Sequence, residues 1–285
     1  MNLAVGFFDG VHLGHRKILA RADAALTFLE HPLALLAPEK APALLMTSEE
    51  RMDAIASALG SKCRDKVRAL PFTRELADRS REDFAADLRR DYPDLETIYC
   101  GPNWNFGAGG AGNADFLRSK GFAVETMPLE QHEGLPISST RIRAALKSGD
   151  MPLANAMLGR PFAVCGDVAP GKGEGRKLGF PTLNVRPANS CLAELLPFGV
   201  YVVDTEFGRG VANWGLAPTM DGQAWPSPIL EVHVLGRGEG EKVGRNGEKV
   251  EISLVGFLRT ERRFASIEAL REQIAVDVFS ASHST

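Results

Sequence analysis

The chain reads LAVGFFDGVHLGH over residues 3–15. Its first part, Leu3 to Phe7, is an apolar run with the character of a strand, and glycines and two histidines follow directly. Glycine lets the backbone approach a ligand closely, and a turn from a strand into a helix presents free backbone N–H groups to a phosphate. The stretch therefore predicts a strand, a phosphate-binding turn and a helix.

The two histidines of this stretch, His12 and His15, stand three positions apart on the predicted first helical turn. At that spacing both rings can face one anion and donate hydrogen bonds to a phosphoryl oxygen as charge develops in a transition state. The alternative is that they only cap or pack the turn.

The rest of the first half alternates short apolar runs with amphipathic stretches, the pattern of parallel strands joined by helices. The pairs Thr47/Glu50 and Ser80/Asp83 have the spacing of helix starts. We expect an α/β domain over residues 1–148, with strands at 3–7, 26–29, 66–70, 97–100 and 123–127.

The second half is rich in glycine, proline and β-forming residues, which indicates a small antiparallel barrel. We expect its strands to include 162–168, 200–205, 229–235 and 250–258, and a closing helix over 266–279. Residues 149–160 would be a linker, and residues 161–285 the second domain.

A second group of anion-binding candidates stands in ISSTRIR, residues 137–143. Ser138, Ser139 and Thr140 supply hydroxyls, and Arg141 and Arg143 supply guanidinium groups at the start of a predicted helix. The helix dipole and these donors all favour an anion. A serine that merely capped the helix would account for one hydroxyl and neither arginine.

Composition narrows the class of protein. The 285 residues carry a formal net charge of -3, which gives no general attraction to nucleic acid. The four cysteines form no CxxC pair, so neither a zinc knuckle nor a disulfide framework is indicated. Without a basic leader or an apolar run of about 18 residues, we expect a soluble cytoplasmic protein that acts on small molecules, with no membrane partner.

The phosphate-binding segments resemble the signature of the HxGH nucleotidyltransferases. The ordered set of motifs is similar, over essentially the whole chain, to the bacterial bifunctional riboflavin kinase/FAD synthetase (FMN adenylyltransferase) family. The motifs are GFFDGVHLGH from Gly6, TFLEHP from Thr27, GPNWNFG from Gly101, ISSTRIR from Ile137 and LGRP from Leu158. This resemblance implies a Rossmann-like HxGH nucleotidyltransferase domain, then a small antiparallel β-barrel riboflavin kinase domain with a C-terminal helix.

For the first domain, the resemblance implies that the FMN phosphate attacks the α-phosphorus of Mg-ATP and that pyrophosphate leaves. Such an enzyme acts by positioning and charge stabilisation. His12 and His15 would be catalytic. The groups that bind ATP phosphates would be Gly6, Phe8, Asp9, Gly10, Ser138, Ser139, Thr140 and Arg143. The flavin would meet His31, Asn103, Trp104 and Phe106, although core packing is an open alternative for Trp104.

For the second domain, the glycine-rich stretch GDVAPGKGEGR, residues 166–176, is either a flexible hairpin or a phosphate cradle. It leads into KLGFPTLN, residues 177–184, which matches the kinase motif GFPTAN. The family places Mg²⁺ on Thr182 and Asn184, whose oxygens suit this ion, whereas a plain turn is the alternative. Phosphates would meet Gly171, Gly173 and Gly175.

Glu231 stands in the alternating run LEVHVL, where it shares a strand face with His233. That alone fits a half-exposed strand. The family implies that Glu231 is the base that accepts the proton of the riboflavin 5'-hydroxyl. Arg259, in LRTERRF, would contact the flavin.

Two departures from the family pattern keep other functions open. Only eleven residues separate His15 from Thr27, so a shortened helix is expected, and Ala217 stands where the family usually has arginine. The rivals are an FAD synthetase with a weak or inactive kinase half, a flavin-binding regulatory homologue, and a nucleotidyltransferase for another substrate. A nucleotidyltransferase for another substrate would leave the motif GFPTLN, residues 179–184, without a role.

Overall fold

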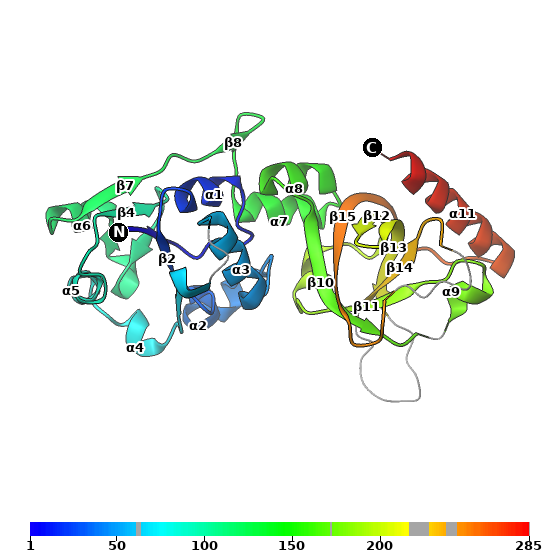
Figure 1. The fold of residues 1–285 in the computed structure, drawn as a ribbon, viewed down its shortest axis with the longest axis horizontal. Coiled ribbons are helices and arrows are strands. Elements are labelled where there is room, and N and C mark those ends of the chain that lie inside the picture. The colour runs from blue at the N-terminus through cyan, green and yellow to red at the C-terminus, as the bar shows by residue number, and fades with distance from the viewer. Residues whose placement is uncertain (61–63, 172, 217–227, 238–243, 285) are drawn as a thin grey trace. The chain divides into compact units, whose positions relative to one another are not determined.

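The computed structural model describes residues 1–60, 64–171, 173–216, 228–237 and 244–284. Ala217 and Cys63 lie outside these residues. The chain forms two compact units, an N-terminal unit Met1–Ser139 and a C-terminal unit Thr140–Thr285 (Figure 1). No helix in the described ranges has the length and apolar character needed to cross a membrane.

The N-terminal unit is built on a five-stranded sheet of order β3-β2-β1-β4-β7, and every neighbouring pair is parallel. The expected parallel sheet is confirmed. Its strands are β1 (Asn2–Val5), β2 (Ala24–Phe28), β3 (Val67–Leu70), β4 (Thr97–Cys100) and β7 (Ala123–Thr126). The chain leaves β1 towards β2 and later returns to place β4 on the other side of β1. The loop after β1 therefore lies at the point where the strand order reverses, which is where open α/β sheets bind ligands.

Helices cover both faces of this sheet. Leu3 belongs to an apolar cluster with Phe84 of α5, whereas Ala4 belongs to the opposite cluster with Leu19 of α1 and Ile55 of α3. Strand alternation produces this division. The helices are α1 (Leu13–Leu19), α2 (Pro32–Leu36), α3 (Ser48–Ala58), α4 (Arg74–Ala77), α5 (Arg81–Asp91) and α6 (Ala114–Ser119).

Two of these helices begin where their caps predict. The backbone N–H of Glu50 donates to Thr47 Oγ1 at 3.2 Å and that of Thr47 to Glu50 Oε2 at 2.6 Å, which completes a capping box for α3. Ser80 caps α5 by accepting from the Asp83 N–H at 3.0 Å. Two small hairpins, β5 (Asn105–Phe106) with β6 (Gly112–Asn113) and β8 (Gln131–His132) with β9 (Leu135–Pro136), complete the unit.

The C-terminal unit contains a closed barrel of order β10-β11-β14-β13-β12-β15, with antiparallel pairs throughout. The predicted barrel is confirmed. Its strands are β10 (Phe162–Ala169), β11 (Leu183–Pro187), β12 (Gly199–Thr205), β13 (Gly208–Leu216), β14 (Pro228–Val234) and β15 (Lys249–Thr260). Of these, β11 and β13 were not anticipated, because β11 is short and ends in proline and β13 contains three glycines.

Short helices accompany the barrel. They are α7 (Ser139–Lys147), α8 (Met151–Leu158), α9 (Glu174–Lys177) and α10 (Leu192–Leu195). The stretch expected to be a linker, residues 149–160, thus contains α8. Asn155 in α8 donates to the Leu254 carbonyl of β15 at 2.9 Å and accepts from the Phe162 N–H of β10 at 2.7 Å. These bonds fasten α8 to the barrel.

The closing helix is α11 (Ile267–His283), capped by Ser266 as predicted and longer at its end than predicted. Val278 packs against Val200 and Val211 of the barrel, whereas Ile267, the first residue of the helix, is exposed. Cys100, Cys165 and Cys191 are in the thiol form.

Candidate functional site

The loop after β1 is strained. Phe8, Gly10 and Val11 have φ values of 59°, 79° and 40°. Glycine adopts such angles freely, but a bulky or β-branched residue does so at a cost of about 1–3 kcal/mol. The Val11 N–H donates to the Phe8 carbonyl at 3.1 Å and holds the turn closed. Two strained residues next to the two histidines mark this loop as a functional site.

The two histidines stack on each other. Their ring centroids lie 3.6 Å apart with an interplanar angle of 18°. Nδ1 of His12 accepts a hydrogen bond from the His15 N–H at 3.3 Å and so caps α1. Because Nδ1 is an acceptor, a neutral His12 carries its ring proton on Nε2. His12 is therefore both the helix cap and a possible donor to an anion.

His15 is half-buried, and its Nδ1 atom is buried without a hydrogen-bond partner. Burial, followed by the charge of neighbouring His12, holds the pKa of His15 well below its usual value. The ring is therefore neutral at pH 7 and has a single N–H to donate. It also meets the Phe8 ring edge-on at 5.3 Å, which ties the strained loop to α1.

Asp9 connects distant segments. Its carboxylate oxygens accept from the Leu45 N–H at 3.1 and 3.2 Å, and its backbone carbonyl accepts from Ser139 Oγ at 2.9 Å. The loop after β1 thus meets the segment that begins α7, 130 residues later. Ser138 is half-buried just before α7, while Thr140 is exposed and Arg143 half-buried in its first turns, within the C-terminal unit.

The residues expected to meet a flavin in the N-terminal unit have different surroundings. His31 caps α2, accepting from the Leu33 N–H at 3.1 Å, and its ring meets Phe7 edge-on at 4.7 Å. Asn103 is exposed. Trp104 is half-buried and lies 4.8 Å from the Phe106 ring, which is buried in the apolar cluster that contains Phe84. Direct flavin stacking by Phe106 would require its ring to leave this cluster.

Sequence reasoning did not identify Arg51, which is fully buried. Its Nη2 donates to the carbonyls of Phe28 and Leu29 at 2.6 and 2.8 Å, at the end of β2. Its Nε and Nη1 are buried without a hydrogen-bond partner. No local signal marks this residue, because an arginine in an amphipathic helix is normally exposed.

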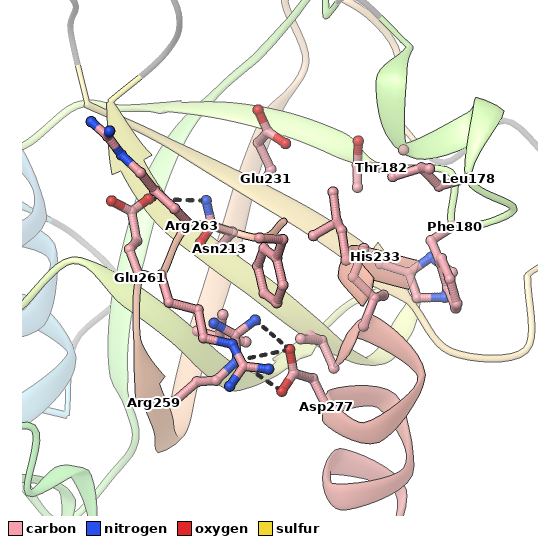
Figure 2. A pocket seen from close by; sticks show the side chains of 17 residues that line it. Leu178, Phe180, Thr182, Asn213, Glu231, His233, Arg259, Glu261, Arg263 and Asp277 are labelled. Atoms are coloured by element: carbon pink, nitrogen blue, oxygen red, sulfur yellow. Dashed lines mark hydrogen bonds and ion pairs between the residues drawn. The ribbon is translucent and has the colours of Figure 1, made fainter. Parts of the chain in front are cut away.

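In the C-terminal unit a cavity of about 700 Å³ opens between barrel strands, the turn after α9, and α11 (Figure 2). Four predicted site residues line it: Gly175, Thr182, Glu231 and Arg259. Figure 2 shows Glu231 and Thr182 on one side of the cavity and Arg259 on the other. Residues widely separated in the sequence therefore converge on one pocket.

Glu231 lies at the centre of a polar row across three strands. Its neighbours in the ladders are Asn184 of β11 and Asn213 of β13. Burial, and secondarily the charge of Glu261, raises the pKa of Glu231. A carboxylate with a raised pKa and a place in a cavity is suited to accept a proton.

A second cavity of about 310 Å³ adjoins this row. Gly171, Gly173 and Asn184 line it, and Thr182 lines both cavities. The backbone of Gly171 lies against the Asn184 amide, where any Cβ would fall 1.6 Å from Nδ2. Two arginines that sequence reasoning missed, Arg176 and Arg237, also line this cavity.

The side chains here fit a hard cation. Asn184 Oδ1 is buried without a hydrogen-bond partner, and the Thr182 side chain faces both cavities. Amide and hydroxyl oxygens are the ligands that Mg²⁺ accepts. The described residues contain no cluster of three or more His, Cys, Asp or Glu suited to a metal.

Among the lining residues of the larger cavity that were not predicted as site residues are Asn213, His233, Glu261 and Asp277. Arg259 Nη2 donates to Asp277 Oδ2 at 2.7 Å, and the Asp277 side chain is only 6 % exposed. The pair fixes the guanidinium of Arg259 against α11. Strand alternation from Glu231 gives a signal for His233, whereas nothing local marks Asp277.

Comparisons with known proteins cover both units. A family model described as FAD synthetase matches residues 1–141, and one described as riboflavin kinase matches residues 158–285. The bifunctional riboflavin kinase/FMN adenylyltransferase of Pseudomonas fluorescens is 35% identical, over 97% of this chain and 90% of the relative. The proteins of that name from Escherichia coli strain K12 and Bacillus subtilis are 33% and 32% identical, with 98% and 96% of this chain and 91% and 89% of the relatives covered.

A solved structure described as a macrolide-efflux protein from Streptococcus pneumoniae has a TM-score of 0.83 to this chain at 26% identity. The match covers 100% of this chain and 94% of that one. The fold of both units thus recurs in a solved structure.

Proposed function

Because the chain belongs to the family of bifunctional riboflavin kinases/FMN adenylyltransferases, we propose that it converts riboflavin to FMN and FMN to FAD with ATP. The barrel, in a domain of residues 161–285, carries the kinase. Adenylyl transfer uses the loop after β1 and the start of α7, in a domain of residues 1–148. ATP is a cytoplasmic metabolite, and we propose that the enzyme works in the cytoplasm.

One observation carries the kinase assignment: Glu231 lies in a polar row beside two cavities that share Thr182. Riboflavin suits the larger cavity, whose volume of about 700 Å³ is in the range of small-molecule sites. ATP phosphates suit the glycine-lined smaller cavity. Transfer of the γ-phosphoryl group then takes place near Thr182, and Glu231 accepts the proton of the riboflavin 5'-hydroxyl.

Thr182 and Asn184 would hold Mg²⁺ by their side-chain oxygens. The ion, when bound, supplies charge neutralisation for the phosphates. Gly171, Gly173 and Gly175 supply backbone that can lie close to phosphate. Arg259, fixed by Asp277, is placed to contact the flavin from the opposite wall of the cavity.

In adenylyl transfer the FMN phosphate attacks the α-phosphorus of ATP, and pyrophosphate leaves. His12 donates from Nε2 to a phosphoryl oxygen, where a well-placed donor stabilises the charge of the transition state. Neutral His15 supports the His12 ring by stacking and contributes its single N–H. The phosphates bind Gly6, Phe8, Asp9, Gly10, Ser138, Ser139, Thr140 and Arg143. His31, Asn103 and Trp104 lie beside the flavin, and Phe106 supports Trp104 from the apolar cluster.

The rival of an FAD synthetase with an inactive kinase rests on Ala217, which is outside the described residues. The convergence of Glu231, Thr182, Asn184 and Arg259 on linked cavities supports an active kinase. The test is to incubate the purified protein with riboflavin, ATP and Mg²⁺ and separate the flavins over time. We expect FMN first and then FAD; FAD formed only from added FMN would favour the rival, and neither product would favour a flavin-binding protein.

A further inference from the structure

His233 makes a contact that the proposed chemistry leaves unused. It stands two positions after Glu231 on β14, and both side chains line the larger cavity. His233 Nδ1 lies 2.9 Å from the carbonyl oxygen of Pro181. Because a carbonyl oxygen only accepts, Nδ1 carries a proton and donates it in this bond. The hydrogen bond thus runs from the strand of Glu231 to the residue that precedes Thr182.

A second contact strengthens this connection. The Phe180 ring meets the His233 ring edge-on, with centroids 5.4 Å apart and an interplanar angle of 88° (Figure 2). Such perpendicular pairs are a favoured arrangement of aromatic rings. Both residues immediately before Thr182 therefore touch the same histidine.

The turn that contains these residues has modest support from its other side. The Phe180 N–H donates to the Gly175 carbonyl at 2.8 Å, and Gly175 belongs to α9, a helix of four residues. A helix this short has little stability of its own. After Thr182 the chain enters β11 at Leu183. The barrel strand β14 contacts Phe180 and Pro181 through His233. It therefore holds the start of β11 in place more firmly than α9 does.

The spacing along β14 places His233 close to Glu231. Residues two apart on a strand point to the same face with about 6.6 Å between their Cα atoms. A short segment of β14 thus carries Glu231 and, two residues later on the same face, His233, which holds the turn that leads to Thr182. Asn184, the other oxygen ligand candidate, pairs directly with Glu231 in the β11–β14 ladder.

We propose that His233 is a positioning residue of the kinase: through Pro181 and Phe180 it fixes the Thr182 oxygen relative to Glu231 and thereby sets the site for Mg²⁺ and ATP phosphates. This inference rests on the proposed kinase function. His233 itself need not touch the reacting atoms. Loss of its hydrogen bond should weaken the metal-nucleotide site more than the flavin site, because Pro181, the residue that accepts this bond, lines the smaller cavity and not the larger one.

Two substitutions separate this role from simple packing. In His233→Asn the amide nitrogen can take the place of Nδ1 and still donate to the Pro181 carbonyl. In His233→Gln the amide lies at the position of Nε2, and the bond is lost. Both variants lose the aromatic ring, so a difference between them reports the hydrogen bond.

The measurements are FMN formation at varied Mg-ATP and riboflavin, and Mg²⁺-dependent ATP binding by calorimetry. For His233→Gln we expect about a tenfold or greater loss of Mg-ATP affinity and of kcat, as is usual when a group that orients a metal ligand is removed. The KM for riboflavin should change by less than about threefold, and His233→Asn should recover most of the loss. FAD synthesis from added FMN, the internal control, should be unchanged.

Equal behaviour of the two variants overturns the inference, whether both match the wild type or both lose riboflavin and Mg-ATP binding together. A wild-type protein that forms no FMN overturns the proposed kinase function and the inference with it. If the wild type forms FMN and His233→Asn and His233→Gln behave alike, the inference about His233 fails while the proposed kinase function stands.

Discussion

The guanidinium carbon of Arg51 lies 3.9 Å from the centre of the Phe7 ring in the interior of the N-terminal unit. Phe7 in turn meets His31 edge-on, and the Thr27 hydroxyl donates to the Phe7 carbonyl at 3.2 Å. Together with the bonds of Arg51 to Phe28 and Leu29, these contacts join the ends of β1 and β2. The buried positive charge thus lies beside the loop assigned to phosphates.

Replacing Arg51 by Met should lower kcat/KM for FAD synthesis about ten- to a hundredfold. Charge-assisted hydrogen bonds contribute about 1.5–3 kcal/mol, and each 1.4 kcal/mol corresponds to about tenfold in rate. Initial rates with added FMN measure the effect. Arg118→Met is the matched control, because Arg118 also donates to a strand carbonyl, that of Val124, at 3.1 and 2.9 Å. Equal losses in two folded variants would show that Arg51 has no special connection to the site.

His12→Ala should reduce FAD formation by about a hundredfold or more, because it removes a donor aimed at developing charge. FMN formation from riboflavin should continue at the wild-type rate, since the kinase site lies in the C-terminal unit. Both products can be followed in one reaction by chromatography. A parallel fall of FMN and FAD in a folded variant would contradict the assignment of two separate sites.

His15 should make stability depend on pH. Its pKa is held well below its usual value in the folded protein, while the unfolded chain has the ordinary value of about 6.5. Below pH 6.5 the unfolded state therefore binds a proton that the folded state does not, and stability falls as pH falls. The slope from this one residue approaches about 1.4 kcal/mol per pH unit.

Denaturant unfolding at several pH values between 5 and 8 measures this dependence, and His15→Gln provides the comparison. The variant should lose less stability than the wild type on acidification below about pH 6.5. Parallel curves for the two proteins would mean that His15 titrates alike in the folded and unfolded states.

Local patterns in the sequence predicted much of the fold. The capping box of Thr47 and Glu50 involves neighbours in the chain, so spacing alone reveals it. Glu231 was placed on the correct strand face by alternation. By contrast, packing between elements decides that Asp277 accepts hydrogen bonds from Arg259 and that Arg51 is buried. Contacts of that kind leave no periodic trace in the sequence.

The missed strand β13 also depends on packing that the sequence does not reveal. The residues of β13 include three glycines, which lower strand propensity, yet close backbone packing requires glycine there. A Cβ on Gly210 would lie 2.6 Å from the His233 carbonyl oxygen, whereas one on Gly215 would meet only the movable end of the Glu261 side chain. Gly210, which weakens the sequence signal of β13, therefore lets this strand pair closely with β14, the strand of Glu231 and His233.

Asp277→Asn should raise the KM of the kinase for riboflavin with little change in the KM for Mg-ATP. The carboxylate accepts from Nε and Nη2 of Arg259, and an amide cannot accept both bonds in the same way. The guanidinium would then be free to leave the wall of the cavity. Riboflavin binding, followed by quenching of flavin fluorescence, checks this; unchanged binding would remove Arg259 from the flavin contacts.

Glu231→Gln should stop FMN formation and leave FAD synthesis from added FMN unchanged. The amide keeps the shape of the side chain but cannot accept a proton. In the wild type, kcat/KM of the kinase should fall on acidification as Glu231 becomes protonated. Because burial and Glu261 raise the pKa of Glu231, this fall should begin above the usual range of a glutamate.

Glu261→Gln separates the two causes of that raised pKa. The substitution removes a like charge from the cavity and leaves the half-buried position of Glu231 unchanged, so the pKa of Glu231 should decrease. The acidic fall of kcat/KM should then move to lower pH while the kinase stays active. A profile that does not move would mean that burial alone raises the pKa of Glu231. A profile with no acidic fall in the wild type, combined with normal FMN formation by Glu231→Gln, would require another group to accept the proton of the riboflavin hydroxyl.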